Sequence, residues 1–500
     1  GAFFGPTRRS PHTDEVAMTD HRFVRFVLSP SSSTLALLQA LPVAVLLGGC
    51  APPSSIGTSS GGSGPSGSGG SASGGSTASG GSGSGGSMAS GGSGSGGATS
   101  SGGATASGGI SASGGASGSS VGGASGGASG SGGASGMAAC QSGKPTPAAG
   151  GLAFPFPQHR FSSACAYPTV CSDMDVATAW KNYKTKFIVD GGNGSLRVQR
   201  TTTSYPDGGK VDNNDTVSEG MAYGMIFAVF MGEKDTFDAL WKYVQAHLDG
   251  TGLMNWKIDP GGGVAGDGRN SATDADEDMG FALVMADKQW GGYASTAKDF
   301  LKKVSTACFG SDGTIKAGDN YGAINPSYLA PAFYRTFAKY TGDSRWMTIL
   351  DKSYQILQGT QNSTTGLVPD WSSGRSGPNY GYDAARTPYR IALDACWNNE
   401  PRAISFSQTI AKFFAGVGAA NIKDGYEVGT GNPMGPNTNS TFVGPAGTSA
   451  MPAKQTKLLD DAYAFVAADG NKGTESYFNL SWALFSALMM TGNIADLTQY

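Results

Sequence analysis

Hydrophobic residues recur at helical spacing through most of the chain after residue 172. In the segment 235–248 apolar side chains return every three or four residues, and Asp235 stands where a helix cap is expected. The segment that opens with Asn325 and Pro326 carries the same spacing, with Asn as cap and Pro at the first helical position. Few stretches alternate between polar and apolar residues as strands do. Further helices are predicted at 176–188, 219–231, 276–290, 293–308, 344–357, 383–397, 403–417, 449–455, 459–468 and 477–490.

The predicted helices fall into two kinds. Segments 220–231 and 478–490 are apolar nearly all round, as is typical of helices inside a protein, whereas 297–304 has an apolar stripe with lysines opposite it. These two kinds predict an all-α domain with an inner and an outer layer of helices. Two concentric rings of six helices would place the apolar helices inside and the amphipathic ones outside.

Glycine is concentrated in one part of the chain. Of the 80 glycines, 34 lie between residues 57 and 139, where the sequence is almost only Gly, Ser, Ala and Thr. Such a segment has little to bury and cannot offset the entropy of ordering itself. We therefore expect residues 51–150 to be a disordered Gly/Ser-rich tether and residues 151–500 to form one large domain.

The first fifty residues look like an export signal. Arg22 and Arg25 precede an apolar stretch at 35–47, which is short for a membrane span and is interrupted by Pro42. It ends in Leu47-Gly48-Gly49-Cys50, which resembles the lipobox of bacterial lipoproteins and makes Cys50 the expected lipidated residue. An ordinary secretory signal is the alternative. Either way we expect an exported protein, at the bacterial cell surface or outer membrane or secreted, with a lipid anchor as its only contact with a membrane.

Charge indicates which class of ligand the protein can bind, and cysteine content indicates which disulfides it can form. The formal net charge is -3, and residues 151–500 carry no Lys/Arg stripe, which argues against a nucleic-acid partner and favours a neutral ligand. Without Cys50 an odd number of cysteines remains, so at least one thiol is expected to stay free or to pair outside the chain. Cys165 and Cys171 are close enough to bridge a small loop, and no metal-binding spacing is present.

Glu219 is the first candidate for chemistry. It follows Ser218, a good helix cap, so its charge could simply favour the start of a helix. The small residues Gly220 and Gly224, however, let the helix pack closely and leave Glu219 under an apolar roof. A carboxyl group in such surroundings resists ionisation and suits a general acid.

Three alternating acids follow Thr273, a potential cap at another helix start: Asp274, Asp276 and Asp278. They resemble the opening of a calcium loop, but Met279 and Met285 occupy the positions that need Gly and Glu. In a helix Asp274 and Asp278 share one face while Asp276 points elsewhere, so at most two of them address one site.

Asp383 lies between Tyr382 and Arg386, where a loop enters a helix. An ordinary Asp–Arg ion pair is one interpretation. A functional interpretation is a general base, because an arginine can orient a carboxylate and keep it charged. Aromatic residues that could stack on sugar rings, or simply pack in the core, are Trp256, Tyr321, Tyr382 and Tyr477. Together with Arg386 they are the expected substrate-binding residues.

These motifs together resemble glycoside hydrolase family 8. The resemblance rests on four blocks in family order: Ser218-Glu219-Gly220 with Tyr223-Gly224-Met225; Ala272-Thr273-Asp274-Ala275-Asp276 with Met279, Ala282, Leu283, Val284, Ala286 and Trp290; Asn325-Pro326-Ser327-Tyr328; and Tyr382-Asp383-Ala384 with Arg386. Mild departures are Ala222, Gly280 and Tyr389, where the family more often has Gly or Ser, Ala, and Trp.

The resemblance implies an (α/α)6 barrel that hydrolyses β-1,4-linked polysaccharide with inversion. Glu219 would be the proton donor, Asp383 the base that activates water, and Asp274 the acid that binds and helps distort the sugar. No metal or cofactor is implied, and we expect a monomer.

The intact acid motifs favour the cellulase branch, hence an endo-β-1,4-glucanase. Chitosan, mixed-linkage β-glucan and xylan stay open as substrates. Two other classes are an inactive carbohydrate-binding lipoprotein and a terpene-cyclase-like enzyme that holds magnesium with its Asp cluster.

Overall fold

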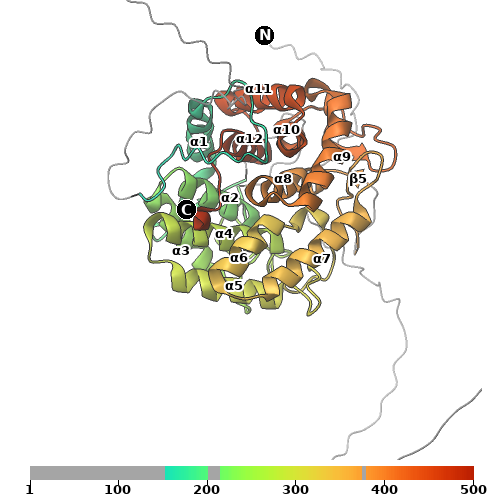
Figure 1. Ribbon diagram of the computed structural model, residues 1–500. Helices are drawn as coiled ribbons and strands as arrows, with labels where there is room; N and C mark the ends of the chain where they lie inside the picture. Colours follow the sequence, from blue (N-terminus) through green and yellow to red (C-terminus); the bar gives the residue numbers. More distant parts are fainter. Residues whose placement is uncertain (1–151, 201–213, 374–378) are drawn as a thin grey trace, which may run out of the picture. The chain divides into compact units, whose positions relative to one another are not determined.

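Two rings of helices build the part of the chain that the computed structural model describes, residues 152–200, 214–373 and 379–500 (Figure 1). The inner ring consists of α2 (Ser218–Phe230), α4 (Thr273–Trp290), α6 (Pro331–Thr341), α8 (Thr387–Asn398), α10 (Ser440–Ala453) and α12 (Tyr477–Met490). The outer ring consists of α1 (Asp173–Phe187), α3 (Lys234–Ala246), α5 (Ala294–Ala307), α7 (Arg345–Thr360), α9 (Pro401–Val417) and α11 (Thr456–Lys472).

The inner ring closes on itself. Each inner helix contacts the next one in the order α2, α4, α6, α8, α10 and α12. Between α12 and α2 the contact is aromatic, with the ring centroid of Phe485 4.8 Å from that of Tyr223 and 4.5 Å from that of Phe227. The predicted all-α barrel of two concentric rings is therefore confirmed.

Burial explains which helices lie inside. Every residue of α2 is buried except Glu219, and every residue of α12 is buried except Phe478. In α5, by contrast, Lys298, Lys302 and Lys303 are exposed while the opposite stripe packs inward. The two sequence patterns thus separate the layers as predicted.

Among the residues that the structure describes, short secondary elements lie on the loops between the helices and after α12. Three two-stranded antiparallel sheets pair β1 (Ile188–Gly192) with β2 (Ser195–Val198), β3 (Thr216–Val217) with β4 (Lys257–Ile258), and β5 (Asn379–Tyr380) with β6 (Tyr426–Glu427). Four 3₁₀ helices are η1 (Pro326–Tyr328), η2 (Ala384–Arg386), η3 (Ala419–Asn421) and η4 (Leu497–Gln499). Strand β3 runs directly into α2, and η2 runs directly into α8.

Helix α10 is the largest departure from the predicted elements. A short helix at 449–455 was expected, but α10 begins at Ser440 and contains Pro445 and Pro452. Its interior position overrides its poor helix propensity, because all residues from 440 to 452 are buried. Gly447 permits this packing, since a Cβ there would come within 2.5 Å of side-chain atoms of Ala462 and Met490.

Several predicted helix caps are wrong. Ser218 and Thr273 are the first residues of α2 and α4, and neither helix has a side-chain cap. Their backbone N–H groups instead donate to the carbonyl oxygens of Trp256, at 2.9 Å, and Ala317, at 3.0 Å, so neighbouring loops satisfy these helix ends.

Two other caps differ as well. Asp235 lies inside the first turn of α3, which begins at Lys234. Asn325 does cap through its side chain, which accepts the Ser327 N–H at 3.0 Å, but it caps η1. Helix α6 begins later, at Pro331.

Cysteine pairing also differs from the expectation. Cys165 forms a disulfide with Cys396 in α8, so the bridge to Cys171 that the short spacing allowed does not form. The hydrogen bond from the Ala166 N–H to the Met451 carbonyl, at 2.9 Å, shows why: the segment before α1 crosses the C-terminal ends of α8 and α10. Cys171 is disulfide-bonded too, while Cys308 is buried and free, as the odd count required.

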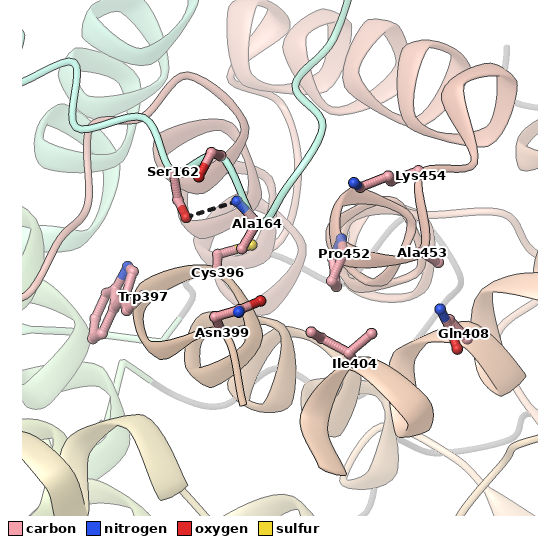
Figure 2. Close-up of a pocket in the computed structure, with 11 residues that line it drawn as sticks. Ser162, Ala164, Cys396, Trp397, Asn399, Ile404, Gln408, Pro452, Ala453 and Lys454 are labelled. Carbon is pink, nitrogen blue, oxygen red and sulfur yellow. Dashed lines mark hydrogen bonds between the residues drawn. The ribbon is translucent and has the colours of Figure 1, made fainter. Parts of the chain in front are cut away.

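A cavity of about 480 Å³ lies at the C-terminal ends of α8 and α10 (Figure 2). Its walls include Trp397 and Asn399 from the end of α8, Gln408 from α9, and Lys454 after α10. The expected export segment with Cys50 and the expected tether lie outside the described residues. Within the ranges that are described, no helix combines the length and the hydropathy that crossing a bilayer requires.

Candidate active site

Arg386 gathers the three acids singled out in the sequence. Its Nη1 donates to Glu219 Oε2 and to Asp274 Oδ2, both at 2.6 Å, and its Nη2 donates to Asp383 Oδ1 at 2.7 Å. Glu219 and Asp274 are the second residues of the inner helices α2 and α4, and Asp383 immediately precedes η2 and α8. The acids thus meet because three inner helices begin at the same end of the barrel.

The guanidinium of Arg386 is enclosed. Only 2% of its side chain is exposed, and its central carbon lies 5.1 Å from the ring centroid of Tyr328. Since one guanidinium bridges Glu219 and Asp383, the bonded oxygens of the two acids lie at most about 8 Å apart. All three acids therefore face one small volume.

Glu219 lies in an environment that favours its neutral form. Its Oε1 accepts a hydrogen bond from the Tyr477 hydroxyl at 3.1 Å, and 19% of its side chain stays exposed. Burial, with a smaller contribution from the charges of Asp274 and Asp383, raises the pKa of Glu219 to about 7, although Arg386 and Tyr477 oppose the rise. A carboxyl group with this pKa can still deliver a proton near neutral pH.

Asp383 is held at both oxygens. Arg386 donates to Oδ1, and the indole N–H of Trp371 donates to Oδ2 at 2.9 Å. The side chain is 12% exposed. Two N–H donors fix its orientation and leave the remaining lone pairs as acceptors, as a proton-accepting group requires.

The three aspartates of α4 divide as the helical spacing predicts. Asp278 shares a face with Asp274 and forms a two-point ion pair with Arg390, one turn deeper in the barrel, at 2.8 and 2.9 Å. Asp276 points away and accepts a hydrogen bond from the thiol of Cys308. Asp274 alone of the three binds Arg386.

The predicted aromatic residues differ in their distance from the acids. Tyr477 contacts Glu219 directly. The half-buried Tyr382 precedes Asp383, and its hydroxyl accepts a hydrogen bond from Asn439 at 3.3 Å. The half-buried Tyr321 joins the site through Trp371, with ring centroids 6.1 Å apart.

Trp256 lies beside the start of α2. It is 7% exposed, and its indole N–H donates to the Asp267 carbonyl at 2.6 Å. Its own carbonyl accepts the Ser218 N–H and so anchors the start of α2. We find the side chain turned to the neighbouring loop, while its backbone holds the residue before Glu219.

Two residues that contact the acids or their arginine were not identified from the sequence. Tyr328 lies under Arg386, and Trp371 binds Asp383. Tyr328 belongs to the Asn-Pro-Ser-Tyr block that carried part of the family resemblance, which was a usable signal. Trp371 stands in a loop without periodicity, so nothing in the local sequence connects it with Asp383.

The chemistry available is that of carboxyl groups. In the part of the chain that the structure describes, no group of three or more His, Cys, Asp or Glu side chains is arranged to hold a metal ion. A carboxyl group that keeps its proton near neutral pH faces an oriented carboxylate across a shared arginine. With the closed double ring of helices, this site defines a helical-barrel glycoside hydrolase.

Comparison with known proteins gives the family. Residues 154–492 match the model of glycosyl hydrolases family 8, and the chain belongs to this family. Endoglucanase C of Ruminiclostridium cellulolyticum is 36% identical over 375 residues, which cover 71% of this chain and 79% of that protein. Endoglucanase A of Acetivibrio thermocellus is 38% identical over 339 residues, which cover 63% and 69%. The apo structure of a β-1,3-1,4-glucanase from Paenibacillus sp. X4 aligns with a TM-score of 0.63 at 30% identity, over 68% of this chain and 98% of that chain.

Proposed function

We propose that this glycoside hydrolase is an endo-β-1,4-glucanase that works with inversion, with Glu219 as general acid and Asp383 as general base. The observation that carries the proposal is the triple contact of Arg386 with Glu219, Asp274 and Asp383. It brings an acid with a raised pKa and an oriented carboxylate to one place.

The proposed reaction is a single displacement. Glu219 gives its proton to the glycosidic oxygen as the bond from that oxygen to the anomeric carbon breaks. A water molecule attacks the anomeric carbon from the opposite face, and Asp383 takes the proton that the water loses. Glu219 ends ionised and Asp383 protonated, and exchange with solvent restores both.

Asp274 has a binding role in this scheme. Its second oxygen, Oδ1, accepts the Ala275 N–H at 2.9 Å and keeps a lone pair that can accept a hydrogen bond from a sugar hydroxyl at the cleavage point. Inverting enzymes need roughly 6.5–9.5 Å between the two working carboxyl groups, and the limit of about 8 Å set by Arg386 is compatible with that spacing.

The names of the relatives support glucan as substrate. Two relatives that match much of the domain are called endoglucanases. The β-1,3-1,4-glucanase structure at 30% identity favours mixed-linkage β-glucan as the second candidate. Two half-buried tyrosines of the site, Tyr321 next to Trp371 and Tyr382 next to Asp383 in the chain, are candidates for stacking on neutral sugar rings.

The test is a pair of amide variants. Glu219→Gln and Asp383→Asn should each lower the release of reducing sugar from carboxymethylcellulose by about 10²–10⁴-fold. Both should keep the far-UV circular dichroism spectrum and the binding of cello-oligosaccharides. Asp351→Asn on the outer helix α7, at a side chain that is 61% exposed, is the matched control and should keep the wild-type rate. Wild-type rates for Glu219→Gln would remove Glu219 from the acid role, and an inactive wild type that binds glucan would favour a binding protein.

We further propose that the protein is exported and lipidated at Cys50. The Cys165–Cys396 disulfide supports an oxidising compartment, in which such bonds persist. Expression in a bacterium with radiolabelled palmitate should label the wild-type chain and leave Cys50→Ser unlabelled. Label in both chains, or in neither, would contradict lipidation at this residue.

A further inference from the structure

A fourth carboxyl group, that of Asp370, lies directly behind Asp383. Its Oδ1 accepts the backbone N–H of Gly381 at 2.9 Å and that of Ala384 at 2.7 Å. These two donors stand on either side of Tyr382 and Asp383 in the chain. One oxygen atom therefore closes the backbone loop that presents Asp383.

The surroundings of Asp370 are shaped for this contact. The Asp370 N–H donates to the carbonyl of Asn379, in β5, at 2.8 Å, which fixes the position of its backbone. A Cβ at Gly381 would come within 2.4 Å of Asp370 Oδ2, so the absence of a side chain at Gly381 makes room for the carboxyl group. The next residue, Trp371, donates to Asp383 itself.

We propose that Asp370 is a positioning residue for the base: it holds the 381–384 loop so that the carboxylate of Asp383 stays aimed at the attacking water. The inference rests on the proposed function, because it takes Asp383 as the base. Asp370 acts through the backbone of the loop and through no contact with the substrate.

The expected effect is on the rate of the chemical step. Without an acceptor at position 370, the N–H groups of Gly381 and Ala384 lose their partner and the loop relaxes toward water or other acceptors. A shift of about 1 Å in a reacting group can lower the rate by about 10²-fold. Substrate binding, which other side chains provide, should change much less.

The protonation of Asp370 indicates which substitution preserves its role. Burial, followed by the charge of Asp383, raises the pKa of Asp370 to about 7, while the two backbone hydrogen bonds oppose the rise. Neutral and charged carboxyl groups both offer an oxygen to the two N–H donors. The amide oxygen of asparagine offers the same acceptor, so Asp370→Asn should keep the loop closed.

The experiment compares kcat and KM on soluble β-glucan for three variants with the wild type. Asp370→Ala should lower kcat by about 10²-fold with KM changed less than about threefold, and Asp370→Asn should stay within about tenfold of the wild-type kcat. Gly381→Ala keeps the carboxyl group but displaces it, and should lower kcat like Asp370→Ala. It also covers the case in which Asp370→Ala fails to fold.

The matched control is Asn362→Ala in the same connection between α7 and α8. The Asn362 Oδ1 also accepts two backbone N–H groups, those of Thr364 and Thr365, both at 2.9 Å, but the turn that it closes, residues 362–365, carries none of the three acids. This variant should lose thermal stability and keep kcat.

Two outcomes overturn the inference and leave the proposed function intact. One is a near-wild-type kcat for Asp370→Ala and Gly381→Ala while Asp383→Asn is inactive. The other is an Asp370→Asn variant as impaired as Asp370→Ala, because rescue by the amide is what a positioning acceptor predicts. If Asp383→Asn itself kept the wild-type rate, the proposed function would fail instead.

Discussion

At the scale of single residues, charge imbalance is the main feature of the site. One arginine faces three carboxyl groups, and all of them are largely removed from water. One arginine cannot balance three negative charges. The pKa of Glu219 is raised to about 7, first by burial and then by its acidic neighbours.

The pH dependence of catalysis follows from this pKa. Glu219 must be protonated to donate, so kcat/KM should fall tenfold for each pH unit well above about 7, as the free enzyme loses that proton. Initial rates on a soluble β-glucan between pH 5 and pH 9 check this. A profile that stays flat up to pH 9 would contradict the assignment of Glu219 as the acid.

Site residues could be predicted where their neighbours in sequence indicate their role. They could not be predicted where the site is formed by loops that are distant in sequence. Glu219, Asp274 and Asp383 could be chosen from the sequence because each acid stands at a helix start among apolar or aromatic residues. For their common partner, Arg386, the sequence indicated a pair with Asp383 and a place in substrate binding, but gave no sign of its contacts with Glu219 and Asp274, which are distant in sequence. The contribution of Trp371 depends on the path of a loop, which no periodicity records.

At the scale of elements, the starts of the inner helices define the site. Helices α2 and α4 begin without side-chain caps, and their first N–H groups are bound by the carbonyls of adjacent loops. The sequence predicted caps at Ser218 and Thr273 because isolated helices need them. In the barrel a carbonyl group of a neighbouring loop replaces the side-chain cap. The capping rules therefore located both helices correctly but assigned the wrong residues and contacts to their first turns.

A second ion pair joins two inner helices below the site. Asp278 of α4 and Arg390 of α8 are almost fully buried and bind through two hydrogen bonds. Burial raises the pKa of Asp278, whereas Arg390 opposes the rise. The pair links α4, which carries Asp274, to α8, which follows Asp383. It therefore also helps to fix the positions of these two acids relative to each other.

Removing one partner of this pair should destabilise the fold. Arg390→Met leaves Asp278 as a buried carboxylate without its cation, and the free energy of unfolding should drop by about 3–5 kcal/mol in urea titrations at pH 7. The control is Lys457→Met, which breaks an exposed pair with Asp461 on α11 and should change stability by about 0.5 kcal/mol or less. Equal effects of the two substitutions would show that the buried pair has no special role.

At the scale of the whole domain, the segment before α1 ties the barrel together. The Cys165–Cys396 disulfide connects residues 231 positions apart in sequence. The bond lies at the C-terminal end of α8, roughly 15 Å along the helix from Arg386. Sequence proximity favoured Cys171 as the partner of Cys165. Cys396 is the partner because the chain before α1 crosses the end of the barrel. The spacing of cysteines in the sequence does not reveal that path.

The disulfide should contribute to stability and leave the chemistry unchanged. A Cys165→Ala/Cys396→Ala double variant should lose about 2–4 kcal/mol of unfolding free energy under non-reducing conditions, because its unfolded chain regains freedom. Its kcat on soluble β-glucan at 25 °C should match the wild type. Cys308→Ala removes a buried thiol and no bridge, and should lose only about 1 kcal/mol. Loss of kcat in the folded double variant would contradict the separation of this bond from the site.

The stereochemistry of the product tests the central claim most directly. Proton NMR can follow the anomeric signals in the first minutes after the wild-type enzyme is mixed with a β-1,4-linked gluco-oligosaccharide. If Glu219 donates the proton while Asp383 activates water on the opposite face, the new reducing end appears first as the α-anomer and then equilibrates. Initial appearance of the β-anomer would mean that a covalent intermediate forms, and would contradict the acid and base roles given to these two residues.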